Sequence, residues 1–142
     1  YRSKVLDDSP ADPGQAATYF TARLTFEADC ADVGADLAAG CGGFVVVDCR
    51  STQAYQAGHV PGAISMPHRR ITAEMADAML PPDAVVVTYC DGPHCNASTR
   101  GGLRLAQLGR PVKEMHGGLD GWIRDGLPVE TGPGRAALQP RP

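Results

Sequence analysis

The sequence predicts an α/β fold with a central, mostly parallel sheet of five strands and helices on both faces. Short strand-like runs alternate with helix-like segments along the chain, which is typical of this class. Residues 44–50 (FVVVDCR) and 84–90 (AVVVTYC) are continuous apolar runs, as expected for strands buried on both faces. At 142 residues, the chain is long enough for one domain with a buried core.

The first part of the chain combines a polar leader with a helix and an edge strand. Residues 1–16 are polar and rich in Pro and Gly, so we expect a flexible lead-in. A short helix is predicted over 17–24 and a short edge strand over 24–29. Residues 32–40 have a helix pattern that ends on a Gly cap, and the first buried strand, 44–50, follows.

Two short helices in the middle of the chain carry N-cap signals. Ser51 or Thr52 is expected to cap a helix over 51–58. Thr72 is expected to cap a second helix over 72–80. These caps place both helices between strands, as the alternating pattern requires.

The remaining elements complete the predicted sheet. The third strand is expected at 63–68 and the fourth at 84–90, followed by a helix over 98–109. A fifth strand at 111–118 and a last helix over 119–126 end the domain. We therefore expect one domain over residues 17–130.

The C-terminal segment and the composition restrict the function. Residues 131–142 are rich in Gly, Pro and Arg, and we expect a flexible tail. The formal net charge of -3 gives no basic stripe for nucleic acid. The apolar runs are too short to cross a membrane, and no signal-peptide pattern is present. We expect a cytoplasmic protein with no nucleic-acid or membrane partner.

Five cysteines lie at irregular spacing, which favours free thiols in a reducing compartment. Cys49 lies inside a buried strand and is interpreted as a small hydrophobe. Cys30 and Cys41 flank a helix pattern and are interpreted as incidental. The two remaining cysteines, Cys90 and Cys95, lie together in one loop.

Cys90 stands where a strand ends and a helix begins. Backbone N–H groups converge at such a point, and the positive end of the helix dipole favours a thiolate. Because ligands of parallel sheets bind beyond the carboxyl ends of the strands, the same position is suited to catalysis. The sequence thus predicts an enzyme that uses sulfur as its nucleophile.

A metal site is not expected in this loop. Cys90 and Cys95 are five residues apart, with His94 between them and His116 further along. Structural zinc sites pair cysteines two to four residues apart and need a second pair, which this chain lacks. We predict neither a metal nor another cofactor.

Three motifs, in order, resemble the rhodanese-like domain. The first, DCRSTQAYQAGHVPGAISMP, contains Asp48, Arg50, Gly58, His59, Pro61, Gly62 and Ala63. The second is the strand VVVTYC with its loop and helix, and the third is MHGGLDGWIRDGLPV, with Gly117, Gly118 and Trp122. The resemblance covers roughly residues 25–130 and implies a rhodanese-like fold.

The resemblance also implies a sulfurtransferase. Family members take a sulfane sulfur from a donor such as thiosulfate onto the active-site cysteine and pass it, as a persulfide, to a thiophilic acceptor. The expected partners are therefore a small-molecule sulfur donor and a thiol acceptor, which can be a protein thiol. No cofactor beyond the covalent persulfide is implied. Asp48 and Arg50 are expected to brace the loop beneath the cysteine.

The active-site loop departs from the common family length. Ser98, the helix-opening serine, follows Cys90 by eight residues, two more than usual, and Ala97 stands where an Arg is frequent. Cys90 is the favoured nucleophile because it ends the strand, whereas Cys95 is the alternative nucleophile or a resolving thiol. The remaining residues of the predicted substrate-binding loop are Asp91, Gly92, Pro93, His94, Asn96, Ala97, Ser98, Thr99 and Arg100.

Two other functions stay open. A phosphatase or arsenate-reductase-like enzyme would suit an enlarged loop, but such a phosphate loop needs an arginine six positions after its cysteine, and Arg100 is one position too close to Cys95. A non-catalytic rhodanese module, acting as a redox or sulfur sensor or as a binding domain, would retain both cysteines without turnover. The sequence does not indicate the oligomeric state.

Overall fold

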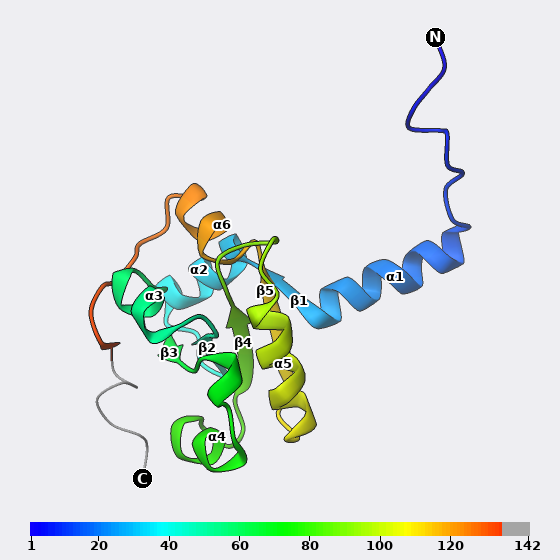
Figure 1. Cartoon of the computed structure of the whole chain (residues 1–142). Helices are drawn as coiled ribbons and strands as arrows, with labels where there is room; N and C mark the ends of the chain where they lie inside the picture. Colours follow the sequence, from blue (N-terminus) through cyan, green and yellow to red (C-terminus); the bar gives the residue numbers. More distant parts are fainter. Residues whose placement is uncertain (135–142) are drawn as a thin grey trace.

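The computed structural model describes residues 1–134 and contains one five-stranded sheet (Figure 1). All its strand pairs are parallel, in the order β1-β5-β4-β2-β3, which confirms the predicted class. The strands are β1 (Glu27–Asp29), β2 (Phe44–Asp48), β3 (Ile64–Ser65), β4 (Val85–Tyr89) and β5 (Val112–His116). β4 lies in the middle of this order, so the loop that follows it stands over the centre of the sheet.

Helices cover both faces of the sheet. They are α1 (Pro13–Phe26), α2 (Cys30–Ala39), α3 (Thr52–Ala57), α4 (Ala73–Met79), α5 (Ala97–Gln107) and α6 (Gly118–Arg124), with a 3-10 turn η1 (His68–Arg70) before α4. Val47 and Val86 pack in one core with side chains of α4 and α5. Their neighbours Val46 and Val87 pack in a second core with side chains of α2, α3 and α6. The strands are thus buried on both faces, as their continuous apolar runs predict.

α1 differs from the prediction at both ends. It begins at Pro13, inside the segment expected to be a lead-in, because the Asp12 carboxylate accepts the Gly14 N–H (2.9 Å) and proline suits the first helical position. It continues to Phe26, so residues 24–26, expected in a strand, are helical. The strand itself is confined to Glu27–Asp29.

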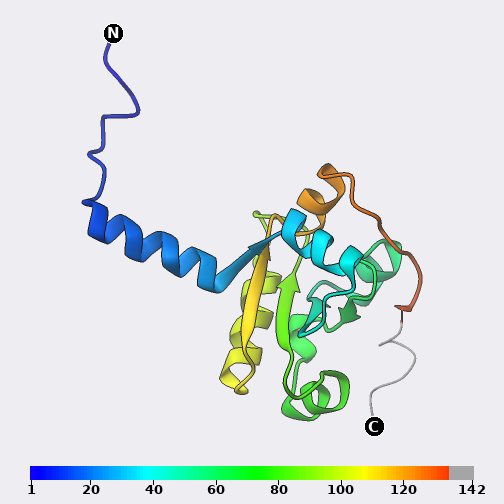
Figure 2. The same ribbon diagram turned by 180° about the vertical axis from the view of Figure 1, so that it is seen from behind.

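α1 buries none of its residues and extends away from the body of the domain, and the N-terminal segment projects further still (Figures 1 and 2). Tyr19, Phe20, Leu24 and Phe26 are 57–76% exposed. The helix therefore contributes little to the domain core.

The other boundaries agree more closely with the sequence. The predicted strand 63–68 is reduced to Ile64–Ser65, since Pro67 lacks an N–H and the chain turns into η1. Residues 135–142, part of the predicted tail, lie outside the described residues. No helix within residues 1–134 has the length and apolar character needed to span a membrane.

Candidate active site

The candidate site is the loop between β4 and α5. Cys90 immediately follows β4 and is 2% exposed, whereas Cys95 is half-buried further along the loop. α5 begins at Ala97, one residue before the position expected from sequence, and Ser98 lies buried in its first turn. Both cysteines are free thiols.

The first turn of α6 holds the start of this loop. The Leu119 N–H donates to the Cys90 carbonyl (2.8 Å), and the Asp120 N–H donates to the Asp91 carbonyl (2.7 Å). Gly118 has φ +59°, and a Cβ atom there would lie 2.8 Å from the Gly92 nitrogen. Only glycine combines this backbone conformation with such a close approach to the loop.

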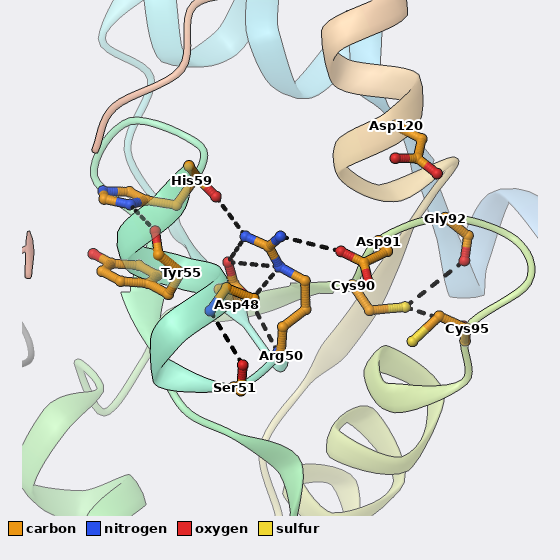
Figure 3. A network of polar contacts seen from close by, with 12 residues as sticks. Asp48, Arg50, Ser51, Tyr55, His59, Cys90, Asp91, Gly92, Cys95 and Asp120 are labelled. Atoms are coloured by element: carbon orange, nitrogen blue, oxygen red, sulfur yellow. Dashed lines mark hydrogen bonds and ion pairs between the residues drawn. The ribbon is translucent and has the colours of Figure 1, made fainter. Parts of the chain in front are cut away.

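A buried ion pair ties the end of β2 to the same loop (Figure 3). The Asp48 carboxylate accepts the Arg50 guanidinium (2.7 Å) and the Tyr89 hydroxyl (2.6 Å). Arg50 reaches further and donates to the Asp91 carboxylate (3.1 Å). Burial lowers the pKa of Arg50, but hydrogen bonding and the negative charge of Asp48 outweigh it, so the net effect is a raised pKa. Arg50 is thus a charged strap between the sheet and the first loop residue.

The Cys90 sulfur has an environment that the sequence did not predict. Its thiol donates to the Cys95 carbonyl (3.0 Å), and it lies 3.2 Å from the Ser98 hydroxyl. Burial raises the pKa of the Cys90 thiol, the Cys95 thiol adds to the rise, and the Ser98 hydroxyl and N–H oppose it. The net effect is a raised pKa for Cys90, whereas the sequence predicted N–H groups that favour the thiolate.

The extra length of the loop explains this difference. The Cys95 N–H donates to the Gly92 carbonyl (3.0 Å), which makes a turn inside the loop. This turn leaves the carbonyls of Gly92 and Cys95 facing the Cys90 sulfur, as Figure 3 shows. Both carbonyls can accept the S–H proton, so this loop geometry favours the thiol over the thiolate.

A cavity of about 230 Å³ opens beside the Cys90 sulfur. It is lined by Cys90, Gly92, Pro93, Cys95, Ser98, Thr99, Glu114, Met115, His116, Gly117 and Gly118. Both loop thiols therefore belong to one cavity that is large enough for a small sulfur compound.

Several predicted loop residues lie outside this cavity lining. Arg100 is exposed, and its guanidinium donates to the Asn96 side chain (3.3 Å). The His94 ring is also exposed, 4.0 Å from the Asp120 carboxylate. Ala97 is buried beneath the loop. The predicted substrate-binding loop is therefore divided between cavity residues, buried supports and an exposed rim.

Glu114 belongs to the site but was not predicted from the sequence. Its Oε2 atom accepts the hydroxyls of Ser98 (2.7 Å) and Thr99 (2.6 Å) at the start of α5. The position of Glu114 three residues before the first of the paired glycines, in a strand that neighbours β4, could have indicated it. The alternating pattern of β5 was too weak to show which of its side chains face α5.

The described residues contain no group of three or more His, Cys, Asp or Glu side chains placed to hold a metal ion. A second, larger cavity of about 760 Å³ lies among α1, α2 and the sheet and includes neither Cys90 nor Cys95. The cavity that contains both loop cysteines is therefore separate from this larger one.

The family model for the rhodanese-like domain matches residues 34–125, which include both cysteines, the ion-pair strap and the Gly117–Gly118 turn. The chain belongs to the rhodanese-like family. Thiosulfate sulfurtransferase GlpE of Pseudomonas entomophila is 36% identical over 95 residues, covering 66% of this chain and 83% of that protein.

Another curated relative has a different role. The HTH-type transcriptional regulator Rv0324 of Mycobacterium tuberculosis is 42% identical over 94 residues, or 64% of this chain. The chain spans only 39% of the length of that regulator. The same family domain thus occurs in a named enzyme and in a named regulator.

Solved structures agree with the fold. The BH2092 protein from Bacillus halodurans superposes with a TM-score of 0.81 at 37% identity, covering 89% of this chain and 91% of that one. A thiosulfate sulfurtransferase from Pseudomonas aeruginosa gives a TM-score of 0.65 at 28% identity, covering 81% of this chain and 22% of that one.

Proposed function

We propose that this rhodanese-like protein is a sulfurtransferase that carries sulfane sulfur on Cys90. The observation that carries the proposal is the position of the Cys90 sulfur at the end of the central strand, beside a cavity and next to Ser98 on α5. The likeness to GlpE supports the same activity. A reducing, cytoplasmic location would keep both loop thiols available.

The first half-reaction forms a persulfide. The Cys90 thiolate attacks the outer sulfur of a donor such as thiosulfate, the sulfur–sulfur bond of the donor breaks, and sulfite leaves with the electron pair. The product is a persulfide anion on Cys90 inside the cavity. The first turn of α5, an 11-residue helix, presents the Ser98 N–H and the positive end of its dipole to this charge.

The second half-reaction regenerates the thiolate. A thiolate acceptor attacks the terminal sulfur of the persulfide, and the bond to the Cys90 sulfur breaks with its electrons returning to Cys90. Splitting the transfer in two lets donor and acceptor use the same cavity in turn.

Cys90 is preferred over Cys95 as the nucleophile because its backbone is fixed at several points. The Leu119 N–H anchors the Cys90 carbonyl, and the strap from Arg50 anchors the following residue. The backbone of the half-buried Cys95 is held from within the same loop, by its N–H bond to the Gly92 carbonyl and by the Cys90 thiol at its own carbonyl. Nucleophilic attack depends on such positioning.

Intact-mass measurement after thiosulfate treatment tests the proposal. The wild-type protein should gain one sulfur atom, Cys90→Ser should gain none, and Cys95→Ser should still gain it. Loss of the gain only in Cys95→Ser would move the nucleophile to the other thiol. No gain in any form would refute thiosulfate as donor.

A second candidate function is a sulfur sensor, favoured by the likeness to the regulator and by two thiols on one cavity. In that case the Cys95 thiolate attacks the Cys90 persulfide, a disulfide forms between the two residues, and the terminal sulfur leaves as hydrosulfide. Multiple turnovers with a thiol acceptor would favour the transferase. A single conversion to a disulfide, without turnover, would favour the sensor.

A further inference from the structure

The buried Cys90 thiol has to lose a proton before it can attack a donor. Its nearest acceptors other than the Ser98 hydroxyl are carbonyl oxygens, and these cannot carry the proton away at neutral pH. The side chains that continue from Ser98 therefore decide how the nucleophile is activated.

A continuous chain of hydrogen bonds leads from Cys90 to a carboxylate. The Cys90 sulfur lies 3.2 Å from the Ser98 hydroxyl, and that hydroxyl lies 2.7 Å from Oε2 of Glu114. Ser98 is 4% exposed, so bulk water does not compete for its hydroxyl. The Thr99 hydroxyl, 2.6 Å from the same oxygen, fixes the orientation of the carboxylate.

We propose that Glu114 accepts the proton of Cys90 through the Ser98 hydroxyl when the nucleophile attacks. The Cys90 S–H first rotates from the Cys95 carbonyl to the Ser98 oxygen. Its S–H bond then breaks and the proton passes to the Ser98 oxygen, while the hydroxyl proton of Ser98 passes to Glu114. The result is a Cys90 thiolate that accepts a hydrogen bond from Ser98, next to a protonated Glu114. When the acceptor later removes the sulfur, the proton returns along the same path.

A serine hydroxyl has only one proton, and this makes the relay a two-state arrangement. With Glu114 ionised, Ser98 donates to Glu114 and the Cys90 sulfur keeps its proton. With Glu114 protonated, Ser98 is free to donate to the Cys90 thiolate. Glu114 is therefore a positioning residue for the proton and does not itself touch the sulfur donor.

Other titratable groups surround the relay without replacing it. Glu27, paired with Glu114 across β1 and β5, is occupied by Arg23 at 3.3 Å and lies 3.6 Å from His116. Neither the Cys49 thiol, buried directly after β2, nor the Cys95 thiol is hydrogen-bonded to the Ser98 hydroxyl within residues 1–134. Glu114 is thus the carboxylate that directly continues the path from Cys90.

The rate of Cys90 alkylation by iodoacetamide, followed by mass across pH 5 to 10, tests the relay. This proposal rests on the proposed function for its biological role, but alkylation needs no sulfur donor, so either proposal can fail separately. In the wild-type protein, the rate should stay nearly level from pH 6 to 8. In Glu114→Gln, the alkylation rate at pH 7 should be at least about tenfold lower than in the wild type. Below the pKa of the thiol, the rate of this variant should decrease about tenfold for each pH unit.

Three further variants separate a relay from a structural role. Ser98→Ala should give the same pH profile as Glu114→Gln, and the double variant should lose nothing more. Glu114→Asp should recover part of the rate at pH 7. Glu74→Gln, which neutralises an exposed glutamate of α4, should behave as the wild type. Parallel pH profiles for the wild type and Glu114→Gln, or faster alkylation in Glu114→Gln, would overturn the proposal.

Discussion

Gly118→Ala is expected to displace the active-site loop and to destabilise the fold together. Residues other than glycine pay about 1–2 kcal/mol in the left-handed conformation that Gly118 adopts at φ +59°. The new Cβ would lie 2.8 Å from both the Asp91 carbonyl carbon and the Gly92 nitrogen, so the loop must move by at least about half an ångström. Weakening the two hydrogen bonds from Leu119 and Asp120 costs about 1–3 kcal/mol more.

The expected sum is a loss of about 2–5 kcal/mol in the free energy of unfolding, measured by urea denaturation. The rate of Cys90 persulfidation should fall about 100-fold, since a shift of about 1 Å at a reacting group has that effect. Gly126→Ala is the matched control, because Gly126 has φ +73° but no atom within 4 Å of a new Cβ. It should lose only about 1–2 kcal/mol and keep its persulfidation rate. Equal losses in the two variants would refute the reasoning.

Three further outcomes are expected from buried polar groups and can be measured by urea denaturation. Tyr89→Phe should lose about 1–3 kcal/mol, because its hydroxyl donates to Asp48 and accepts the Val60 N–H, and an unchanged midpoint would contradict this. Asp48→Ala should lose about 3–5 kcal/mol by leaving Arg50 buried without its main partner, and a loss below that of Tyr89→Phe would contradict it. Burial raises the pKa of Cys30 from 9.0 to about 11, so the native thiol keeps its proton where the unfolded thiol loses it. Stability should therefore fall as pH rises from 9 to 11, and Cys30→Ala should reduce that slope; an unchanged slope would count against this account.

Much of the fold could be predicted because several signals in the sequence agree. The apolar runs at β2 and β4 indicated strands buried on both faces, and both cores contain their side chains. Ser51 and Thr72 accept backbone N–H groups at the starts of α3 and α4, as their positions predict. Local patterns of this kind are decisive where burial and capping point to the same element.

Other features depend on contacts between distant residues and could not be predicted. α1 was expected to be shorter because residues 1–16 were interpreted as a flexible lead-in and residues 24–29 as an edge strand, yet the cap at Asp12 and the start at Pro13 extend the helix. The direction in which the pKa of Cys90 shifts depends on which way the loop carbonyls face, and spacing alone does not determine that. Glu114 reaches the site only because β5 pairs beside β4 and faces α5.

The loop after β4 is anchored almost entirely through its first two residues. The Leu119 and Asp120 N–H groups bind the carbonyls of Cys90 and Asp91, and Arg50 binds the Asp91 side chain. From Gly92 to Asn96, the backbone–backbone hydrogen bonds of the described residues are local: the Cys95 N–H donates to Gly92, and the Arg100 N–H of α5 donates to Asn96. Insertions between Gly92 and Asn96 therefore leave the position of Cys90 unchanged, while they alter the size of the cavity beside its sulfur. With this arrangement, the length of the loop can change during evolution to fit larger or smaller substrates. The stability of the domain does not fall as a result.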